Sequence, residues 1–352
     1  MSEERPRDMS MEDVIALQEQ ACARAGSHLY AEILAAIGAD YAAGGPSARL
    51  LSPWTDNALA DAIPLRLLAA VHRIVLDGRA PGLARFFPSA GGTDGGSAAA
   101  AFLDVLRDHH AEIAGGMHDG VQTNEVGRAC SLVGGFHVVA AETGMPLRIL
   151  EVGASGGLLL RWDQFTYVAG DRRWGGDAGL RFDDPWTDRI PDFVDDLTVR
   201  ERRGCDINPI DPTTPEGVNT LRGFLWPDQV HRRERLDAAI DIAHLHPATV
   251  DRADAGLWVE EQLERPTPGM ATVVFHSIVL QYLPRASFDR LRAAFAGAGD
   301  RATPDAPLYW LRMEPAGVVA DVRLRSWPGG EDRLLGTTGF HGPPVDWTAG
   351  ES

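Results

Sequence analysis

The sequence is poor in cysteine and has too few basic residues to balance its acidic ones. Cys22, Cys130 and Cys205 lie far apart and outside any paired motif, which suits reduced thiols and excludes a disulfide framework. The 33 Lys and Arg residues oppose 50 Asp and Glu residues, so the formal net charge is −17. Because such a surface repels phosphate backbones, a nucleic-acid partner is disfavoured.

Long apolar runs are also missing. No segment approaches the roughly 18 uninterrupted apolar residues needed to cross a bilayer, and the first residues contain no apolar signal core. Together with the reduced thiols, these features predict a cytoplasmic protein without a membrane partner. The histidines at 109–110, 118, 244 and 246 have no matching acidic residues at ligand spacing, so we expect no metal site.

The residues that are present predict two regions with different periods. Hydrophobic residues make up 44% of the chain, enough for a large core. Apolar residues recur at helical spacing through residues 1–145, which predicts an all-helical N-terminal region. From residue 146 to 352 we expect a second domain with two insertions. The first, at about 167–196, begins with a glycine-punctuated hairpin at 167–184, and the second, at 207–228, shows no clear period. Long irregular segments of this kind are usually covers or binding loops.

Within 146–352, short apolar runs alternate with amphipathic helical segments. The strand candidates are 147–152, a stretch near 197–205, 271–276 and 308–313, with helices near 229–244 and 287–296. This alternation predicts a doubly wound, mainly parallel α/β sheet of the Rossmann-like type. Residues 322–326 and 334–339 could add an antiparallel hairpin.

A glycine-rich turn follows the first strand, in the segment Glu151-Val-Gly-Ala-Ser-Gly-Gly157. We expect open peptide N–H groups at 153–157 to receive a ligand at the start of a helix. A dinucleotide motif would require glycine where Ser155 and Leu158 stand, so NAD or FAD is disfavoured. The acidic-x-Gly-x-x-x-Gly spacing instead resembles the first motif of class I S-adenosylmethionine-dependent methyltransferases, with Ser155 in place of a frequent middle glycine. A tight packing turn without a ligand is the structural alternative.

The same turn also satisfies Gly-x-Ser-x-Gly, the nucleophile elbow of α/β-hydrolases, with Ser155 as nucleophile. Asp206 or Asp254 and His276 or His341 could complete a triad. Two features oppose this interpretation: the preceding region is helical rather than stranded, and the acidic Glu151 has no part in it.

Polar residues at the expected strand ends complete the candidate cofactor site, because ligands bind across the carboxyl edge of such sheets. Asp206, with Asp211 as the fallback, is placed to bind ribose hydroxyls, and Asp254 to contact adenine. His276 could remove a proton from the acceptor. The alternatives are an Asx turn at Asp206, a helix N-cap at Asp254 and a hydrogen-bonded structural role for His276.

The ordered set of motifs resembles a bacterial family of unknown function that is grouped with Rossmann-like methyltransferases. The motifs that carry the resemblance are Thr123-Asn-Glu-Val-Gly-Arg128, Glu151–Leu158, Trp162-Asp163, Arg203–Pro212, Trp226–Gln229, Val250–Asp254, Val274–Ser277, Gln281–Pro284, Trp310–Pro315 and Trp327–Gly330. One departure is Ser27-His-Leu-Tyr30, where Ser-Pro-Leu-Tyr is expected. The resemblance implies that Asn124, Glu125, Arg128 and Asp163 belong to the substrate pocket.

The leading hypothesis is methyl transfer from S-adenosylmethionine to a small molecule. Gly153, Ser155 and Gly157 would approach the methionine and ribose portions, and His276 or Glu125 would remove a proton from the acceptor. A serine hydrolase and a non-catalytic adenosyl-ligand-binding protein remain as alternatives.

Overall fold

The chain divides into two compact units in the computed structural model, which describes residues 9–54, 56–177 and 179–349. Unit 1 comprises Met1–Thr123 and Thr214–Glu234, and unit 2 comprises Asn124–Thr213 and Arg235–Ser352. The division therefore differs from the expected one at two places. Residues 124–145 group with the sheet, and part of the expected 207–228 insertion groups with the N-terminal helices.

Unit 1 is helical, as the periodicity of residues 1–145 predicts. Its elements are α1 (Met11–Arg24), α2 (His28–Ala42), α3 (Pro46–Leu51), η1 (Ser52–Trp54), α4 (Ile63–Leu76), α5 (Pro81–Ala84), η2 (Pro88–Ala90), α6 (Ala99–Asp108), α7 (His110–Gly116) and α9 (Pro215–Gly223). Ser10 caps α1 by accepting a hydrogen bond from the peptide N–H of Asp13 at 3.1 Å. The α9 helix was not expected, because Pro and polar residues obscure its period.

A buried histidine joins three parts of unit 1. His72 of α4 is 1% exposed; its Nδ1 lies 3.2 Å from the carbonyl oxygen of Gly223, and its Nε2 lies 2.7 Å from Ser89 Oγ. Because the carbonyl can only accept, Nδ1 carries the proton and Nε2 accepts from the serine hydroxyl. Burial lowers the pKa of His72 to about 4, which means that the folded unit holds this ring neutral.

We therefore expect unit 1 to lose stability in acid through His72. The unfolded chain takes up a proton near pH 6.5 whereas the folded unit resists protonation down to about pH 4, so the free energy of unfolding falls as the pH decreases through this window. The full loss is about 3 kcal/mol. Urea unfolding of wild type and His72→Gln across pH 4–7 measures the effect, and the exposed His28→Gln is the control. An equal slope in wild type and His72→Gln would contradict the assignment.

Unit 2 is built around a large sheet. Its helical elements are η3 (Val126–Arg128), α8 (Ala129–Thr143), η4 (Leu158–Gln164), α10 (Val230–Leu245, which contains the boundary between the units), α11 (Ala255–Gln262), η5 (Leu280–Tyr282) and α12 (Arg285–Gly299). Its strands are β1 (Leu147–Val152), β2 (Thr166–Ala169), β3 (Arg172–Gly175), β4 (Arg181–Asp183), β5 (Val199–Asp206), β6 (Thr249–Arg252), β7 (Ala271–Ser277), β8 (Leu308–Ala316), β9 (Val319–Trp327), β10 (Asp332–Gly339) and β11 (Gly342–Trp347).

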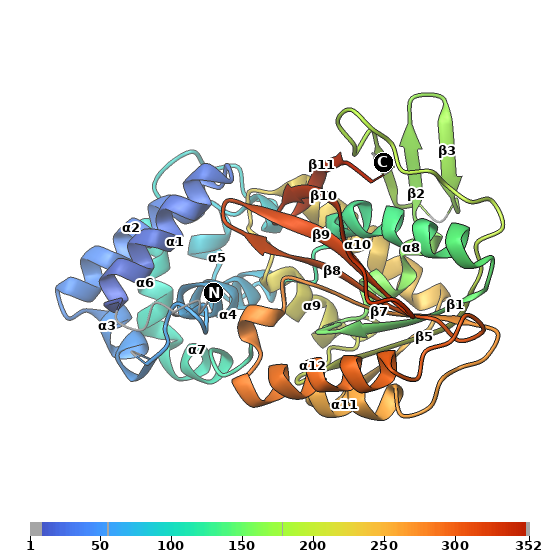
Figure 1. Cartoon of the computed structure of the whole chain (residues 1–352). Coiled ribbons are helices and arrows are strands. Elements are labelled where there is room, and N and C mark those ends of the chain that lie inside the picture. Colours follow the sequence, from blue (N-terminus) through green and yellow to red (C-terminus); the bar gives the residue numbers. More distant parts are fainter. Residues whose placement is uncertain (1–8, 55, 178, 350–352) are drawn as a thin grey trace. The chain divides into compact units, whose positions relative to one another are not determined.

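The eight-stranded sheet has the order β11-β10-β9-β8-β7-β1-β5-β6. Strands β6, β5, β1, β7 and β8 pair in parallel, and β8 to β11 form an antiparallel meander. Helices α11 and α12 cover one face and α8 covers the other (Figure 1). All six residues of β1 are buried, because a central parallel strand is covered on both faces. The expected mixed α/β architecture with a mostly parallel sheet is thus confirmed.

Two local expectations in unit 2 change. The run after the glycine turn is a 3₁₀ segment, η4, with a kink at Arg161, rather than an α-helix. The hairpin expected at 167–184 is instead a three-stranded sheet of order β3-β2-β4, in which β2 pairs with β3 in antiparallel and with β4 in parallel fashion. Its aromatic side chains explain this packing: Tyr167 and Phe182 stack at 5.7 Å between ring centroids, and Trp174 stacks on Phe193 at 5.6 Å.

Candidate functional site

The chain changes direction across the sheet at β1. It passes from β1 to β5 and β6 on one side and then returns to β7 on the other side. In open α/β sheets this switch point creates a crevice outside the carboxyl ends of the two central strands, where ligands bind. The glycine turn follows β1, residues 278–279 follow β7, and Asp206 ends β5 as the sequence predicts. We therefore take this edge as the candidate site.

Three of the five peptide nitrogens at 153–157 are already used by the protein, which corrects the expectation of open N–H groups at Ala154, Ser155 and Gly157. Ala154 N donates to the Cys205 carbonyl at 2.9 Å, and Gly157 N donates to the Ala154 carbonyl at 2.6 Å. Ser155 N donates to Asp206 Oδ2 at 2.9 Å. The physical reason is that β5 pairs with β1 and supplies two of these acceptors, whereas the third is a carbonyl of the turn itself. An anion would find these three donors occupied.

Two side chains hold the turn in place. Asp206 accepts from Ser155 N with Oδ2 and from Asn208 N with Oδ1, the latter at 2.8 Å, so the Asx-turn alternative for this residue is present. Asn124 accepts from Leu158 N at 3.2 Å and donates to the Ala154 carbonyl at 3.3 Å. Each Asp206 oxygen keeps a second lone pair for another donor.

The glycines serve close packing as well as backbone conformation. Gly153 has φ +68°, and a Cβ atom there would lie 2.4 Å from Val279 Cγ2. Gly157 has φ +65°, and its Cβ would lie 2.8 Å from Val250 Cγ2. The turn after β1 therefore lies directly against the turn after β7, a contact that only a residue without a side chain permits.

Backbone strain is located on both sides of the switch point. Ser155 after β1 has φ +52° and Ile278 after β7 has φ +53°, both in the left-handed region. This conformation is uncommon for serine and an outlier for a β-branched residue. Such strain persists only where surrounding contacts impose it, and it concentrates at functional sites. Its presence on two adjacent strands supports the choice of this edge.

The site also contains buried acceptor oxygens without donors. Glu151 is 2% exposed and Ser155 is 5% exposed, yet Glu151 Oε2 and Ser155 Oγ form no hydrogen bond with any described residue. Burial raises the pKa of the Glu151 carboxyl well above its usual range; Arg161 opposes this shift, Asp206 reinforces it and Arg128 opposes it. A buried polar atom without a partner calls for an explanation, and a bound ligand is one.

His276 is fully buried, and both of its ring nitrogens are engaged. Trp310 Nε1 donates to Nε2 at 2.8 Å, so the proton of the neutral ring is on Nδ1, which lies 2.7 Å from Glu314 Oε1. This is the hydrogen-bonded structural arrangement that the sequence left open. Neither nitrogen is available to take a proton from an acceptor, and we do not retain His276 as the base.

Glu125, Arg128 and Asp254 bind backbone atoms near the site. Glu125 caps η3 by accepting from Gly127 N at 3.0 Å. Arg128 donates to the Ser277 carbonyl at 3.1 Å, linking the start of α8 to the end of β7. Asp254 caps α11 through Leu257 N at 3.0 Å, which is the N-cap alternative.

Asp163 lies apart from the turn in a bidentate ion pair with Arg202 of β5, at 2.7 and 2.9 Å. The structure thus brings Asn124 and Asp206 onto the turn that contains Ser155, and Glu151 is the penultimate residue of β1 before this turn. Asp163, Asp254 and His276 are held by other partners.

Three residues of this edge were not singled out from the sequence. Arg161 donates to the Gly157 carbonyl at 2.6 Å, Val279 fills the space in front of Gly153, and Glu314 binds the turn after β7. Glu314 lies within one of the family motifs, Trp310–Pro315, which is the only signal that could have indicated it. The other two have no recognisable pattern.

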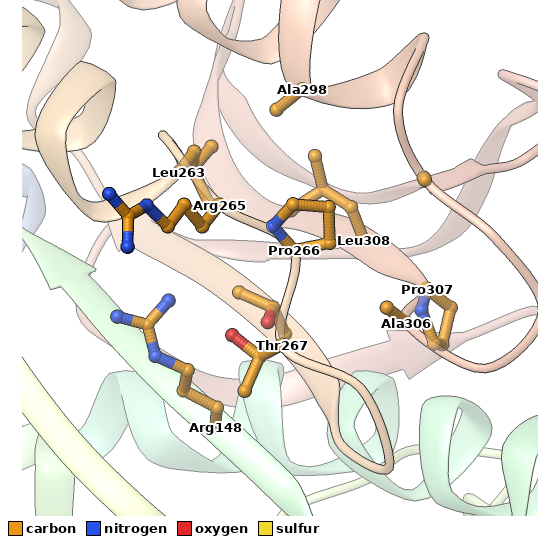
Figure 2. A pocket seen from close by; sticks show the side chains of 11 residues that line it. Arg148, Leu263, Arg265, Pro266, Thr267, Ala298, Ala306, Pro307 and Leu308 are labelled. Carbon is orange, nitrogen blue, oxygen red and sulfur yellow. The ribbon is translucent and has the colours of Figure 1, made fainter.

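A pocket at the opposite, amino edge of the sheet lacks all predicted site residues (Figure 2). It is lined by Arg148, Arg265, Thr267, Leu308 and neighbouring apolar groups. Arg148 donates to the Gln262 carbonyl at 3.1 Å and to its side-chain oxygen at 3.0 Å, so it closes the end of α11. Among the described residues, no group of three or more His, Cys, Asp or Glu side chains is arranged to hold a metal ion.

The chain belongs to a bacterial family described as "Uncharacterized protein conserved in bacteria (DUF2332)", whose profile matches residues 12–347. The resemblance drawn from the motifs to a bacterial family of unknown function is thereby confirmed. No curated protein and no solved structure matches the chain. Within the described residues, no helix has both the length and the apolar character needed to span a membrane.

We expect Ser155→Gly to raise the free energy of unfolding by about 1 kcal/mol, because glycine adopts φ +52° without the penalty of a side chain. The control is Ser277→Gly at the end of β7, which is expected to lower stability through added backbone entropy in the unfolded chain. Urea unfolding measures both. A loss of stability in Ser155→Gly equal to that of Ser277→Gly would show that the serine is not strained.

Proposed function

We propose that this protein is an S-adenosylmethionine-dependent methyltransferase acting on a small molecule, with the cofactor at the carboxyl edge of β1, β5 and β6. The observation that carries the proposal is the pair of buried acceptor oxygens, Glu151 Oε2 and Ser155 Oγ, without donors among the described residues. The parallel order β6-β5-β1-β7-β8 supports a Rossmann-like, methyltransferase-type core, to which β9–β11 add an antiparallel extension.

The chemistry of the edge fits a ligand that donates hydrogen bonds and carries positive charge. Three turn amides are occupied, which disfavours a phosphate, whereas Glu151, Ser155 and Asp206 offer oxygens. S-adenosylmethionine has a sulfonium, an ammonium and two ribose hydroxyls, all of which suit carboxylate and hydroxyl acceptors. When bound, it supplies a methyl group that is already activated toward a nucleophile.

Each residue of the edge has a distinct part in this proposal. Asp206 accepts a hydrogen bond from Ser155 N and uses a further lone pair to accept a hydrogen bond from a ribose hydroxyl. Glu151 binds the cationic portion of the ligand. Gly153 and Gly157 allow the backbone to approach, and the cap residue Asp254 at the end of β6 lies on the adenine side. Asn124 keeps the turn in position, so that the protein's contribution is alignment of the two reactants.

The test is calorimetric titration with S-adenosylmethionine and with its uncharged-sulfur product, S-adenosylhomocysteine. We expect wild type to bind both and Glu151→Gln to bind S-adenosylmethionine about tenfold or more weakly, since a charged hydrogen bond is worth about 1.5–3 kcal/mol. Because burial raises the pKa of the Glu151 carboxyl, binding of a cation favours loss of its proton, and affinity should rise with pH in wild type only.

Glu261→Gln, an exposed position on α11, is the matched control and should leave both affinities unchanged. Absence of binding by wild type to either compound would refute the cofactor assignment. Binding with no methyl transfer to any compound of a bacterial metabolite extract would favour the non-catalytic alternative instead.

The hydrolase alternative is favoured by one observation: the strained, buried Ser155 with an unpartnered Oγ resembles a nucleophile elbow. It is opposed by His276, whose two nitrogens are occupied. Under our proposal a fluorophosphonate probe leaves Ser155 unlabelled, as read by mass spectrometry of the intact protein. Label that appears in wild type and in Ser277→Ala but disappears in Ser155→Ala would establish the hydrolase in place of the methyltransferase.

A further inference from the structure

A carboxylate beside the end of β7 is held by three N–H donors on one oxygen only. Glu314 Oε1 lies 2.7 Å from His276 Nδ1, and it accepts from Val279 N at 3.0 Å and from Leu280 N at 3.3 Å. Its second oxygen, Oε2, is buried and receives no hydrogen bond from the described part of the chain. The Glu314 side chain is 14% exposed as a whole.

A chain of hydrogen bonds from Trp310 through His276 fixes the orientation of this carboxylate. Trp310 Nε1 donates to His276 Nε2, which places the imidazole proton on Nδ1 and directs it at Glu314 Oε1. The imidazole of His276 therefore fixes the orientation of the Glu314 carboxylate, and His276 is a positioning residue. The strained Ile278 directs the next two peptide N–H groups at the same oxygen.

The register of the sheet separates this carboxylate from the proposed cofactor residues. Glu151 pairs with Phe275 on β7, whereas Met313, the residue before Glu314, pairs with Ser277 at the end of β7. The cofactor residues belong to β1, β5 and β6, on one side of β7, and Glu314 belongs to β8 on the other side. An acceptor molecule that faces the cofactor across the switch point is therefore brought toward β7 and β8.

We propose that Glu314 Oε2 is the group that binds the methyl acceptor, and that the acceptor is a small molecule with a hydroxyl or amino nucleophile. This inference rests on the proposed methyltransferase function. A carboxylate attracts O–H and N–H donors and repels carboxylate and thiolate groups. The site therefore favours acceptors with a hydroxyl or amino group over acceptors with a carboxylate or thiolate. Glu314 is then a catalytic residue, and His276 and Trp310 are its positioning residues.

The proton balance of the step is simple. The acceptor oxygen or nitrogen forms a bond to the methyl carbon as the carbon–sulfur bond breaks, and the electron pair of that bond stays on sulfur. A proton of the acceptor hydroxyl, or of the neutral amino group as its nitrogen gains the methyl group, passes to Glu314 Oε2 and then to solvent. No oxidant, reductant or metal is required.

The experiment compares wild type, Glu314→Gln and the control Glu261→Gln. Each full-length protein is incubated with bacterial metabolite extract and S-adenosylmethionine carrying a deuterated methyl group, and products are fragmented by mass spectrometry. We expect label on oxygen or nitrogen with wild type and the control, and at least tenfold less with Glu314→Gln. Affinity for S-adenosylhomocysteine should stay within twofold in all three, which shows that the variant is folded.

A second measurement does not depend on turnover. Native mass spectrometry of each protein with S-adenosylhomocysteine and the same extract records which metabolites are retained. We expect hydroxyl- or amine-bearing compounds on wild type that Glu314→Gln fails to retain. A labelled methyl ester or thioether, or equal labelling and retention by Glu314→Gln, would overturn the inference while leaving the methyltransferase intact. Failure of wild type to bind S-adenosylhomocysteine would overturn both.

Discussion

The hydrogen bond from Ser155 N to Asp206 Oδ2 is the interaction on which the geometry of the candidate site depends. It joins the turn after β1 to the end of β5 and helps to hold a serine at φ +52°. Because this amide and those of Ala154 and Gly157 are satisfied internally, the turn has fewer donors for an anion. Glu151, Ser155 and Asp206 then offer oxygens to a ligand, and these oxygens suit a cation or a hydroxyl donor.

Steric contact imposes a second constraint at the same place. Gly153 and Val279 leave no room for a side chain between the turns after β1 and β7, so the two strained residues, Ser155 and Ile278, lie on turns that pack against each other. Movement of one turn therefore affects the other. This coupling gives a physical reason why strain appears on both strands rather than on one, and why a substitution at either turn is expected to affect binding at the other.

Local patterns in the sequence predict β1, β7 and the first part of β8 well, because each of these is a short apolar run. They place the ends of β1 and β5 correctly, with Asp206 as the last residue of β5. Occupation of the turn amides could not be foreseen, since Asn124 and Asp206 are 34 and 51 residues from their partners. The hydrogen bonds of His276 could not be foreseen either. The apolar sequence of β7 is the same whether the ring nitrogens of His276 are free or, as here, bound by residues of β8.

The antiparallel strand β9 explains how Glu314 reaches the site at all. Strand β7 ends at Ser277, which pairs with Met313 of β8. Beyond Met313, strand β8 therefore has no pairing partner on its β7 side in the part of the chain that the structure describes. Pairing with β9 continues to Ala316, opposite Val319, and keeps Glu314 in regular strand geometry opposite Asp321. The carboxylate is thus carried by a rigid element beyond the end of β7 and beneath the turn that it binds. Because the Glu314 side chain is already fixed, it loses little conformational entropy when a ligand binds. A carboxylate that must orient a reacting molecule requires this property.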